Sequence, residues 1–316
     1  MRLRDWAWPV GIIATLWGAS HLVLRRAYPA PPPGNQAIIV ISGASTGIGR
    51  HAAEYLARLG FTVLAGVRRE ADMEDLRSAH LPSLHPIILD VTNASDVRAA
   101  VERAEALAPL PVWGLVNNAG LGYPIPVELA DMEKARKLFE VNVLAVIGMA
   151  QAFVPLLRRA PGGRIVNVGS ATGTMATQGD GIYASSKHAV EGLTDSMRLE
   201  LAAWEMSVSL VVPGQVQSGM WGKLTGQNAP AINDLSADQY ALYKPLFLQV
   251  EKAVSGFIPK LSPASVTSQA IAHALMSPQP KTRYLVASVN GVPLWLLRGL
   301  CGLLPDRVVD FVKLRL

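Results

Sequence analysis

The stretch AIIVISGASTGIGRHAAEYLARLG, residues 37–60, determines the fold that we expect for the whole chain. It opens with an apolar run, residues 37–42, of the kind that forms a strand covered on both faces. A glycine-rich turn follows. Then comes a segment in which apolar residues recur every three or four positions up to Gly60, which is typical of an amphipathic helix. A strand, a glycine turn and a helix in this order predict the first unit of a parallel α/β sheet.

The same alternation of short aliphatic runs and helical patterns continues to about residue 287. It predicts a Rossmann-type, doubly wound parallel sheet of about seven strands, because parallel strands need helical crossovers of one hand. From Gly214 to about Leu261 the strand pattern lapses, and so long an insertion at the carboxyl end of a strand predicts a lid over a binding site. The runs expected to form strands are residues 37–42, 61–67, 86–90, 112–117, 164–170, 207–212 and 283–287.

The composition is that of a folded globular body. Of 316 residues, half are hydrophobic and 17% are charged, which excludes an intrinsically disordered chain. One cysteine, Cys301, excludes a disulfide framework and a multi-cysteine metal cluster, and the histidines lack metal-ligand spacing, so we expect no metal. The net charge is +5, from 29 basic and 24 acidic residues, but the basic residues form no run of five or more. We therefore expect no nucleic-acid partner.

An uncharged segment, residues 6–24, precedes the alternating pattern. Nineteen helical residues reach roughly 28 Å, close to the thickness of the hydrocarbon core of a bilayer. We expect a single-pass membrane anchor, with the body facing the cytoplasm. The alternatives are a secretory signal peptide and a buried helix of the body.

Four parts are expected along the chain: an N-terminal anchor helix (1–28), a proline-rich linker (29–36), a Rossmann-fold domain (37–290) and an apolar, basic tail (291–316). The prolines of the linker favour an extended spacer without packed structure. The tail is expected either to form an amphipathic helix at a membrane surface, or to pack on the protein itself or in a dimer contact.

The glycine turn after the first expected strand predicts a dinucleotide site. Glycines let backbone amides approach a pyrophosphate, whose charge is also stabilised by the positive end of the following helix. The same turn contains the pattern Gly-x-Ser-x-Gly around Ser45, so a serine hydrolase is an alternative. It is disfavoured because no HGGG-type motif precedes the turn and His273 is the only histidine after His188. The candidate phosphate-loop residues are Gly43, Ser45, Thr46, Gly47, Ile48 and Gly49.

A second constellation centres on Tyr183 and Lys187. Their spacing of four places both side chains on one helix face, one turn apart. A neighbouring ammonium favours the phenolate, so the pair predicts a tyrosine with a lowered pKa that exchanges a proton with a substrate. Ser170, at the end of an expected strand, can supply a hydroxyl to the same substrate oxygen.

In their order along the chain, these motifs resemble those of the short-chain dehydrogenase/reductase family. The resemblance covers about 250 residues, from Ala37 to Ala287. It is greatest to the branch that contains bacterial ketone reductases and steroid- or retinol-active members. The matching motifs are SGASTGIG (42–49), LDV (89–91), NNAG (117–120), the VN of FEVNV (139–143), Ser170, YASSK (183–187) and PGQVQS (213–218).

The resemblance implies roles for the matching residues. Tyr183 is the expected general acid/base, Lys187 lowers its pKa and holds the nicotinamide ribose, and Ser170 orients the carbonyl. Asn142 is expected at a local helix irregularity, where it supports a water chain to Lys187. Further cofactor contacts are expected from Asp90, at the adenine amino group, and from Val91 beside it in the sequence. Contacts near the adenine ribose are expected from Asn117, Ala119 and Gly120. The expected carboxamide loop contributes Pro213, Gly214, Val216 and Ser218, and the family usually has threonine in place of Ser218.

The residues after the second expected strand bear on the choice of cofactor. An NAD site usually carries an acidic residue there, but here Val67 is followed by Arg68 and Arg69. A guanidinium can hold a 2′-phosphate with paired hydrogen bonds, whereas a carboxylate repels it. We therefore expect NADP(H), with Arg68 as the first candidate ligand and Arg69 as the second. Glu70 is near enough to bind the ribose instead, so NAD(H) stays as the alternative.

The sequence therefore predicts a membrane-anchored, NAD(P)(H)-dependent oxidoreductase acting on a small lipophilic substrate. It would interconvert a secondary alcohol and a ketone, or a retinoid-type alcohol and aldehyde. Besides the hydrolase, the alternative is a catalytically silent member of the family that serves as a binding protein. Such members usually lack the tyrosine or the lysine, and both are present here. The resemblance also suggests dimers or tetramers.

Overall fold

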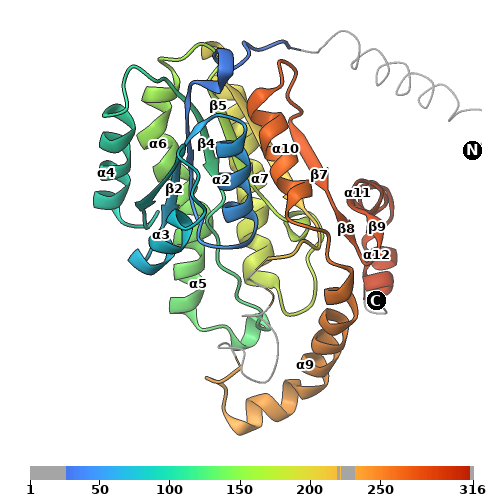
Figure 1. The fold of residues 1–316 in the computed structure, drawn as a ribbon. Coiled ribbons are helices and arrows are strands. Elements are labelled where there is room, and N and C mark those ends of the chain that lie inside the picture. The colour runs from blue at the N-terminus through green and yellow to red at the C-terminus, as the bar shows by residue number, and fades with distance from the viewer. Residues whose placement is uncertain (1–25, 219–220, 222–231, 314–316) are drawn as a thin grey trace, which may run out of the picture.

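The computed structural model describes residues 26–218, 221 and 232–313. Its central element is a seven-stranded sheet in the order β3-β2-β1-β4-β5-β6-β7, in which all neighbouring strands are parallel (Figure 1). The prediction of a doubly wound parallel sheet is thus confirmed. The strands are β1 (Ile38–Ile41), β2 (Thr62–Val67), β3 (Leu84–Ile88), β4 (Val112–Asn117), β5 (Arg164–Val168), β6 (Ser207–Pro213) and β7 (Arg283–Val286).

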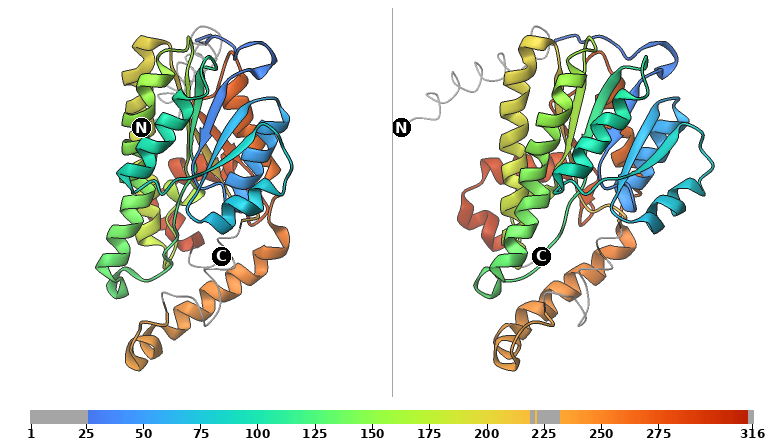
Figure 2. Two further views of the ribbon diagram at one scale, coloured as in Figure 1. Left: turned by 60° about the vertical axis from the view of Figure 1, so that its left-hand side comes forward. Right: turned by 90° about the vertical axis from the view of Figure 1, so that its left-hand side faces the viewer.

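Helices cover both faces of the sheet, as the consecutive apolar residues of the strands require (Figure 2). One hydrophobic layer lies under α2 (Gly47–Arg58), α3 (Glu70–Arg77) and α10 (Ser265–Met276). The other lies under α4 (Ala94–Glu105), α6 (Ala145–Leu157) and α7 (Gly181–Glu200). The short elements between them are η2 (Pro33–Asn35), η3 (Val127–Leu129), the π-helical turn η4 (Glu140–Leu144), η5 (Ala171–Gly173) and η6 (Leu201–Trp204).

The stretch that we predicted as a lid contains a long helix, α9 (Ala237–Phe257), followed by the short η7 (Ile258–Lys260). α9 extends away from the body beyond the carboxyl ends of the strands (Figures 1 and 2). Phe257 is its one buried residue. The helix therefore lies on the side of the sheet where parallel α/β folds bind their ligands.

The proline-rich linker packs on the body, so the expectation of a spacer without packed structure is wrong for its first residues. Arg164 is fully buried at the start of β5 and has no carboxylate partner among the described residues. Its Nη2 donates to the carbonyl oxygens of Pro29 (2.7 Å) and Ser277 (3.1 Å), and its guanidinium lies 5.1 Å from the ring centroid of Tyr28. A buried guanidinium needs acceptors, and the carbonyl of the extended linker supplies one.

The predicted anchor, residues 6–24, lies outside the described residues. Within the described part, one helical stretch, Met132–Leu157, is long and apolar enough to cross a membrane by length and composition. It consists of α5 (Met132–Phe139), η4 and α6, and it is the stretch that packs on the sheet between α4 and α7. We therefore interpret it as a core helix.

The tail forms a small hairpin, β8 (Ser288–Val289) and β9 (Val292–Pro293), and the helices α11 (Leu294–Leu303) and α12 (Asp306–Lys313). α11 packs on the body through Leu294, Leu297 and Cys301. Of the two predictions for the tail, packing on the protein's own surface is confirmed for this helix. Its outer side stays apolar, because Trp295 is 64% and Leu303 is 84% exposed.

Candidate active site

The turns that follow β1, β4 and β5 meet at the carboxyl ends of three adjacent strands (Figure 1). Parallel α/β sheets bind ligands at this edge, where the strand order reverses. Here the chain reverses between β1 and β4, because β2 and β3 lie on one side of β1 and all later strands on the other. The glycine turn, the NNAG motif and Ser170 are therefore brought together as predicted.

The glycine turn lies in direct contact with the turn that follows β4. Gly43 has a φ of +68°, and a Cβ on it would lie 2.7 Å from the Cα of Ala119. A Cβ on Gly49 would lie 2.2 Å from the carbonyl oxygen of Gly43. A larger residue at position 43 would push the two turns apart, and one at position 49 would collide with the carbonyl of its own turn and, at 2.3 Å, with the Asn118 Nδ2. Both contacts explain why the sequence places glycine at these positions.

Two residues that we did not select hold these turns together. Asn118 donates from Nδ2 to the carbonyl oxygens of Ser42 and Gly43, both at 3.0 Å. The Ser42 Oγ accepts from the backbone amides of Asn118 and Ala119 at 3.1 Å. Asn118 could have been selected from the sequence, because it is the second asparagine of the NNAG motif. At the start of α2, no side chain caps the helix, since Thr46 makes no capping bond. These residues therefore fit a pyrophosphate, which the free amides of the first turn would bind.

Three side chains converge at the end of β5. Tyr183 and Lys187 lie one turn apart on α7, and Ser170 is hydrogen-bonded to the Tyr183 hydroxyl. The Lys187 Nζ donates to the carbonyl oxygen of Val168 at 3.0 Å and lies 5.7 Å from the ring centroid of Tyr183. The structure thus brings together Ser170 and Tyr183, which were expected to act on one substrate oxygen, and Lys187, which was expected to assist Tyr183.

The pKa of Tyr183 differs in direction from our expectation. Burial lowers the pKa of Lys187 to about 8, since desolvation penalises the ammonium. Burial also raises the pKa of Tyr183; the hydrogen bond to Ser170 opposes this effect, and the charge of Asp180 adds to it. Desolvation of the phenolate therefore outweighs the hydrogen bond from Ser170, and Tyr183 carries its proton at neutral pH.

Asp180 is a residue that the sequence analysis missed, although its position three residues before Tyr183 was a signal. It is the N-cap residue of α7, yet its side chain accepts no capping bond. Burial raises the pKa of Asp180 to about 7. A carboxyl group that titrates near neutral pH thus lies one helical turn from the tyrosine.

Asn142 lies in the π-helical turn η4, so the predicted helix irregularity is confirmed. Its Oδ1 accepts from the amide of Leu121 at 2.8 Å, and its Nδ2 donates to the carbonyl of Leu121 and to the Oγ of Ser186, both at 3.0 Å. It therefore connects the turn after β4 to α7. A Cβ on Gly120 would lie 3.4 Å from the Asn142 Oδ1 and 3.6 Å from the Lys187 Nζ, so all three residues lie close together.

The residues expected on the adenine side differ in where their side chains lie. Asn117 is 5% exposed, and its Nδ2 donates to the Oδ1 of Asn167 at 2.9 Å, so this side chain lies between β4 and β5 within the sheet. Asp90 follows β3, and its Oδ1 accepts from the amide (2.9 Å) and the hydroxyl (2.7 Å) of Thr92. Val91 is nearly buried beside it.

The two arginines after β2 differ in their partners. Arg69 donates to the carboxylate of Asp72 at 2.9 and 2.6 Å. Arg68 is exposed and has no hydrogen-bond or ion-pair partner among the described residues. The charge of Arg68 acts on the carboxylate of Asp90. Burial raises the pKa of Asp90, but hydrogen bonds from Thr92 and the charges of Lys137 and Arg68 lower it, and the net shift is downward. Arg68 is thus the cation that is available to a ligand.

The expected carboxamide loop begins where β6 ends, at Pro213. A Cβ on Gly214 would lie 2.5 Å from the carbonyl oxygen of Ser288. Val216 is 3% exposed and forms a bridge with Ser262, while Ser218 keeps part of its surface exposed. The loop is therefore fixed at its base by its contact with the β8–β9 hairpin.

The hydrolase alternative lacks a base for Ser45. Within the described residues, the Nδ1 atoms of His51 and His273 pair with Ser268 and Tyr284, each at 2.8 Å. No hydrogen bond joins either histidine to Ser45, so neither of them forms with it the Ser–His pair that acyl transfer needs.

A family model described as "short chain dehydrogenase" matches residues 37–229, which is more than half of the chain. The chain belongs to the short-chain dehydrogenase/reductase family. The resemblance inferred from the motifs is thereby confirmed, and the protein is an oxidoreductase of a family that acts on alcohol and ketone groups.

Two curated relatives of this dehydrogenase are similar over nearly their whole length. Retinol dehydrogenase 5 of Mus musculus is 32% identical over 319 residues, covering 96% of this chain and 95% of the relative. An NADPH-dependent 3-dehydrocapnine reductase of Ornithobacterium rhinotracheale is 30% identical over 277 residues, covering 86% and 94%. A retinol dehydrogenase and a bacterial reductase among the relatives agree with the branch inferred from the motifs.

A solved structure has the same fold. The short chain dehydrogenase from Burkholderia cenocepacia, described in complex with NADP, superposes with a TM-score of 0.65 at 25% sequence identity and covers 88% of this chain and 97% of its own. This chain therefore shares its architecture with a family member that is described in complex with NADP.

The contact at Gly49 gives a testable prediction. Gly49→Ala should weaken binding of the nicotinamide cofactor, because the added Cβ collides with the carbonyl of Gly43 and with the Asn118 Nδ2 and so distorts the glycine turn. Overpacking of this kind usually costs about 1 to 3 kcal/mol, which corresponds to a loss of roughly 5- to 150-fold in cofactor affinity. Quenching of protein fluorescence by the added cofactor would measure it. The control is Gly192→Ala in α7, whose Cβ would meet nothing within 4 Å. Equal affinity of the two variants would contradict the placement of the turn.

Proposed function

We propose that the protein is an NADP(H)-dependent oxidoreductase that interconverts a secondary alcohol and a ketone, or a retinoid-type alcohol and aldehyde, on a lipophilic substrate. The observation that supports this proposal most directly is the convergence of Ser170, Tyr183 and Lys187 at the carboxyl end of β5. The same three residues argue against a silent binding protein, since a binding protein has no need of them.

In the reductive direction, the carbonyl oxygen of the substrate accepts hydrogen bonds from Ser170 and Tyr183. A reduced nicotinamide, when bound, supplies the hydride to the carbonyl carbon. Tyr183 then gives its proton to the oxygen on which negative charge develops, and its raised pKa suits it to hold that proton until then. Lys187, buried one turn away, stabilises the resulting phenolate through its positive charge.

The environment of Tyr183 supports a lipophilic substrate. A hydrophobic cluster of Tyr123, Ile125 and Leu138 lies beside the tyrosine, and Phe247 of α9 packs on it. A ligand that reaches the tyrosine along these residues loses its contact with water, and burial of apolar area is the favourable term in such binding.

α9 acts as the lid in this proposal. It contacts the opposite side of the site through Phe247, and its Tyr243 hydroxyl donates to the carboxylate of Glu128. Lys134 pairs with Asp234, just ahead of the helix. Both polar contacts are exposed and weak, so the lid can separate from the body at low cost.

The preference for NADP(H) rests on Arg68. Its guanidinium has no partner among the described residues, and it lies near Asp90 at the adenine side, where a 2′-phosphate would be bound. Arg69 is less suited, because Asp72 already engages it.

We also propose that residues 1–28 anchor the protein in a membrane, with the dehydrogenase domain at 37–290 on the cytoplasmic side, where the cofactor is available, and that the chain forms homo-oligomers. The described end of that segment docks on the body and supports a fixed connection between the two parts. The Arg26 Nη2 donates to the carbonyl of Ala202 and the Tyr28 amide donates to that of Pro278, both at 2.8 Å.

Replacement of Tyr183 tests the proposed chemistry. Tyr183→Phe should lower the turnover of a lipophilic ketone by about 10² to 10⁴, the usual contribution of general acid catalysis, and should leave cofactor affinity nearly unchanged. Tyr55→Phe, the same change on α2, is the matched control and should keep its turnover. Turnover of the Tyr183 variant close to that of the wild type would refute the assignment.

Replacement of Arg68 tests the cofactor preference. A charge-assisted hydrogen bond is worth roughly 1.5 to 3 kcal/mol, or ~10- to 150-fold in affinity. Arg68→Ala should weaken NADP(H) by about that factor and leave NAD(H) unchanged, as measured by titration with each cofactor. Arg69→Ala should have a small effect. An equal loss for both cofactors, or a wild-type preference for NAD(H), would contradict the proposal.

Carbonate extraction tests the anchor. The full chain should stay with the membrane pellet at high pH. High pH releases proteins that charge contacts hold at the membrane surface, whereas a spanning helix stays in the bilayer. A chain that begins at Arg26 keeps the docked linker and should be released. A soluble full chain, or one from which the first segment has been cleaved, would overturn this part of the proposal.

A further inference from the structure

The turn that carries Ser170 is short and is held by hydrogen bonds within its own backbone. Its amides from Gly173 to Met175 donate to the carbonyls of Ser170 and Ala171 at 2.9 to 3.1 Å. At its far end, the Thr174 hydroxyl donates to the Oε1 of Glu191 at 3.0 Å. This contact fixes the turn to α7 at a point remote from Ser170 itself.

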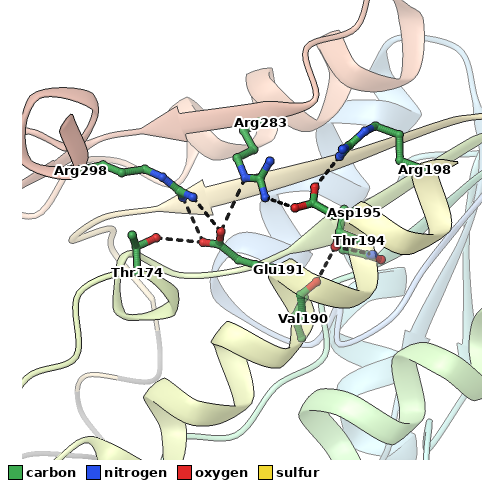
Figure 3. Close-up of polar contacts among 9 residues, drawn as sticks. Thr174, Val190, Glu191, Thr194, Asp195, Arg198, Arg283 and Arg298 are labelled. Atoms are coloured by element: carbon green, nitrogen blue, oxygen red, sulfur yellow. Dashed lines mark hydrogen bonds and ion pairs between the residues drawn. The ribbon is translucent and has the colours of Figure 1, made fainter. Parts of the chain in front are cut away.

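Glu191 is a nearly buried carboxylate, 9% exposed, one turn beyond Lys187 on the same face of α7. Figure 3 shows that three elements meet at its two oxygens. Arg298 of α11 donates to both, at 3.0 and 2.9 Å, and the Nε of Arg283 in β7 lies 3.6 Å from Oε2. A bidentate arginine fixes a carboxylate in orientation as well as in position.

α11 also supports the turn by apolar contact. Ala171 and Met175, at either end of the turn, belong to the same buried cluster as Leu294, and Leu297 and Cys301 of α11 pack on that cluster. α11 therefore shares a buried apolar cluster with the turn and is linked to Thr174 through Arg298 and Glu191.

We propose that Glu191 is a positioning residue for Ser170 and that α11 completes the active site by holding Glu191 through Arg298. This inference rests on the proposed function of Ser170. The Ser170 hydroxyl must lie within hydrogen-bond reach of the reacting oxygen, and a displacement of about 1 Å can slow such reactions roughly 100-fold. The helix that lies outside the matched residues 37–229 is thereby given a role in catalysis.

The neighbouring carboxylate provides an internal control. Asp195 lies one turn further along α7 and pairs with Arg283 and Arg198 (Figure 3). No hydrogen bond of Asp195 reaches the turn 170–175 within the described residues. Arg198→Met therefore removes an ion pair from the same network and leaves the contact between Glu191 and Thr174 in place.

The experiment compares Thr174→Val, Arg298→Met, the double variant and Arg198→Met in the full chain. The rate of a single turnover with NADPH is measured on the ketone that the wild type reduces fastest. The two single variants should each be slower by roughly tenfold. The double variant should be no slower than either, because both changes break one pathway. Arg298→Lys should recover part of the rate, and cofactor affinity should stay within about twofold in every case.

The proposal would be overturned if the rate losses of Thr174→Val and Arg298→Met were additive in the double variant. It would also be overturned if Arg298→Met and Arg198→Met had equal rates when measured well below their unfolding temperatures. Amide hydrogen exchange supplies a readout that needs no substrate. Exchange at residues 173–175 should be faster in Arg298→Met and unchanged in Arg198→Met, and equal exchange in the two variants would also overturn it. If the wild type reduces no ketone, the proposed function fails, whereas the exchange result still decides the coupling.

Discussion

The contact between α7 and β5 is the constraint on which the site depends. A chain of neutral hydrogen bonds crosses it: Asn117 of β4 donates to Asn167 of β5, which donates to Thr194 of α7 at 2.9 Å. Lys187 adds a bond to the carbonyl of Val168. These bonds are buried, so each would leave an unpaired polar group if the helix moved along the strand. The register between helix and strand is fixed, and with it the distance from Tyr183 to Ser170.

From this contact the chemistry follows in both directions. Toward the substrate, α7 presents a tyrosine that burial keeps protonated and a lysine whose charge is available to the phenolate. Away from the substrate, the same face of α7 carries Glu191, which joins the turn of Ser170 to α11. One stripe of residues at helical spacing thus contains both the groups that we propose to react and the residue that we propose to support them.

Much of this arrangement could be predicted from the sequence. Consecutive apolar residues placed all seven strands within about two residues, since a strand buried on both faces leaves little choice of pattern. The glycines at 43 and 49 signalled a close backbone contact, and the spacing of Tyr183 and Lys187 signalled a shared helix face. The irregular turn at Asn142 was expected only through the family resemblance.

Other features depend on contacts between distant residues and could not be predicted. Arg298 and Glu191 are 107 residues apart, and the linker docks on Arg164, which is 135 residues away from Pro29. The direction of the pKa shift at Tyr183 depends on burial and on Asp180, neither of which follows from the spacing to Lys187. Local patterns specify elements, whereas desolvation and long-range ion pairs arise only when the elements pack.

The central claim is that the site transfers a hydride to a ketone carbon while Tyr183 supplies the proton. The most direct measurement uses NADPH carrying deuterium at the transferable position of C4, with the full chain in detergent and a lipophilic ketone. Mass spectrometry of the product should find one deuterium bonded to the carbinol carbon, and the label should be lost from the cofactor in equal amount. A product without the label, or consumption of the cofactor without any alcohol formed, would contradict this account.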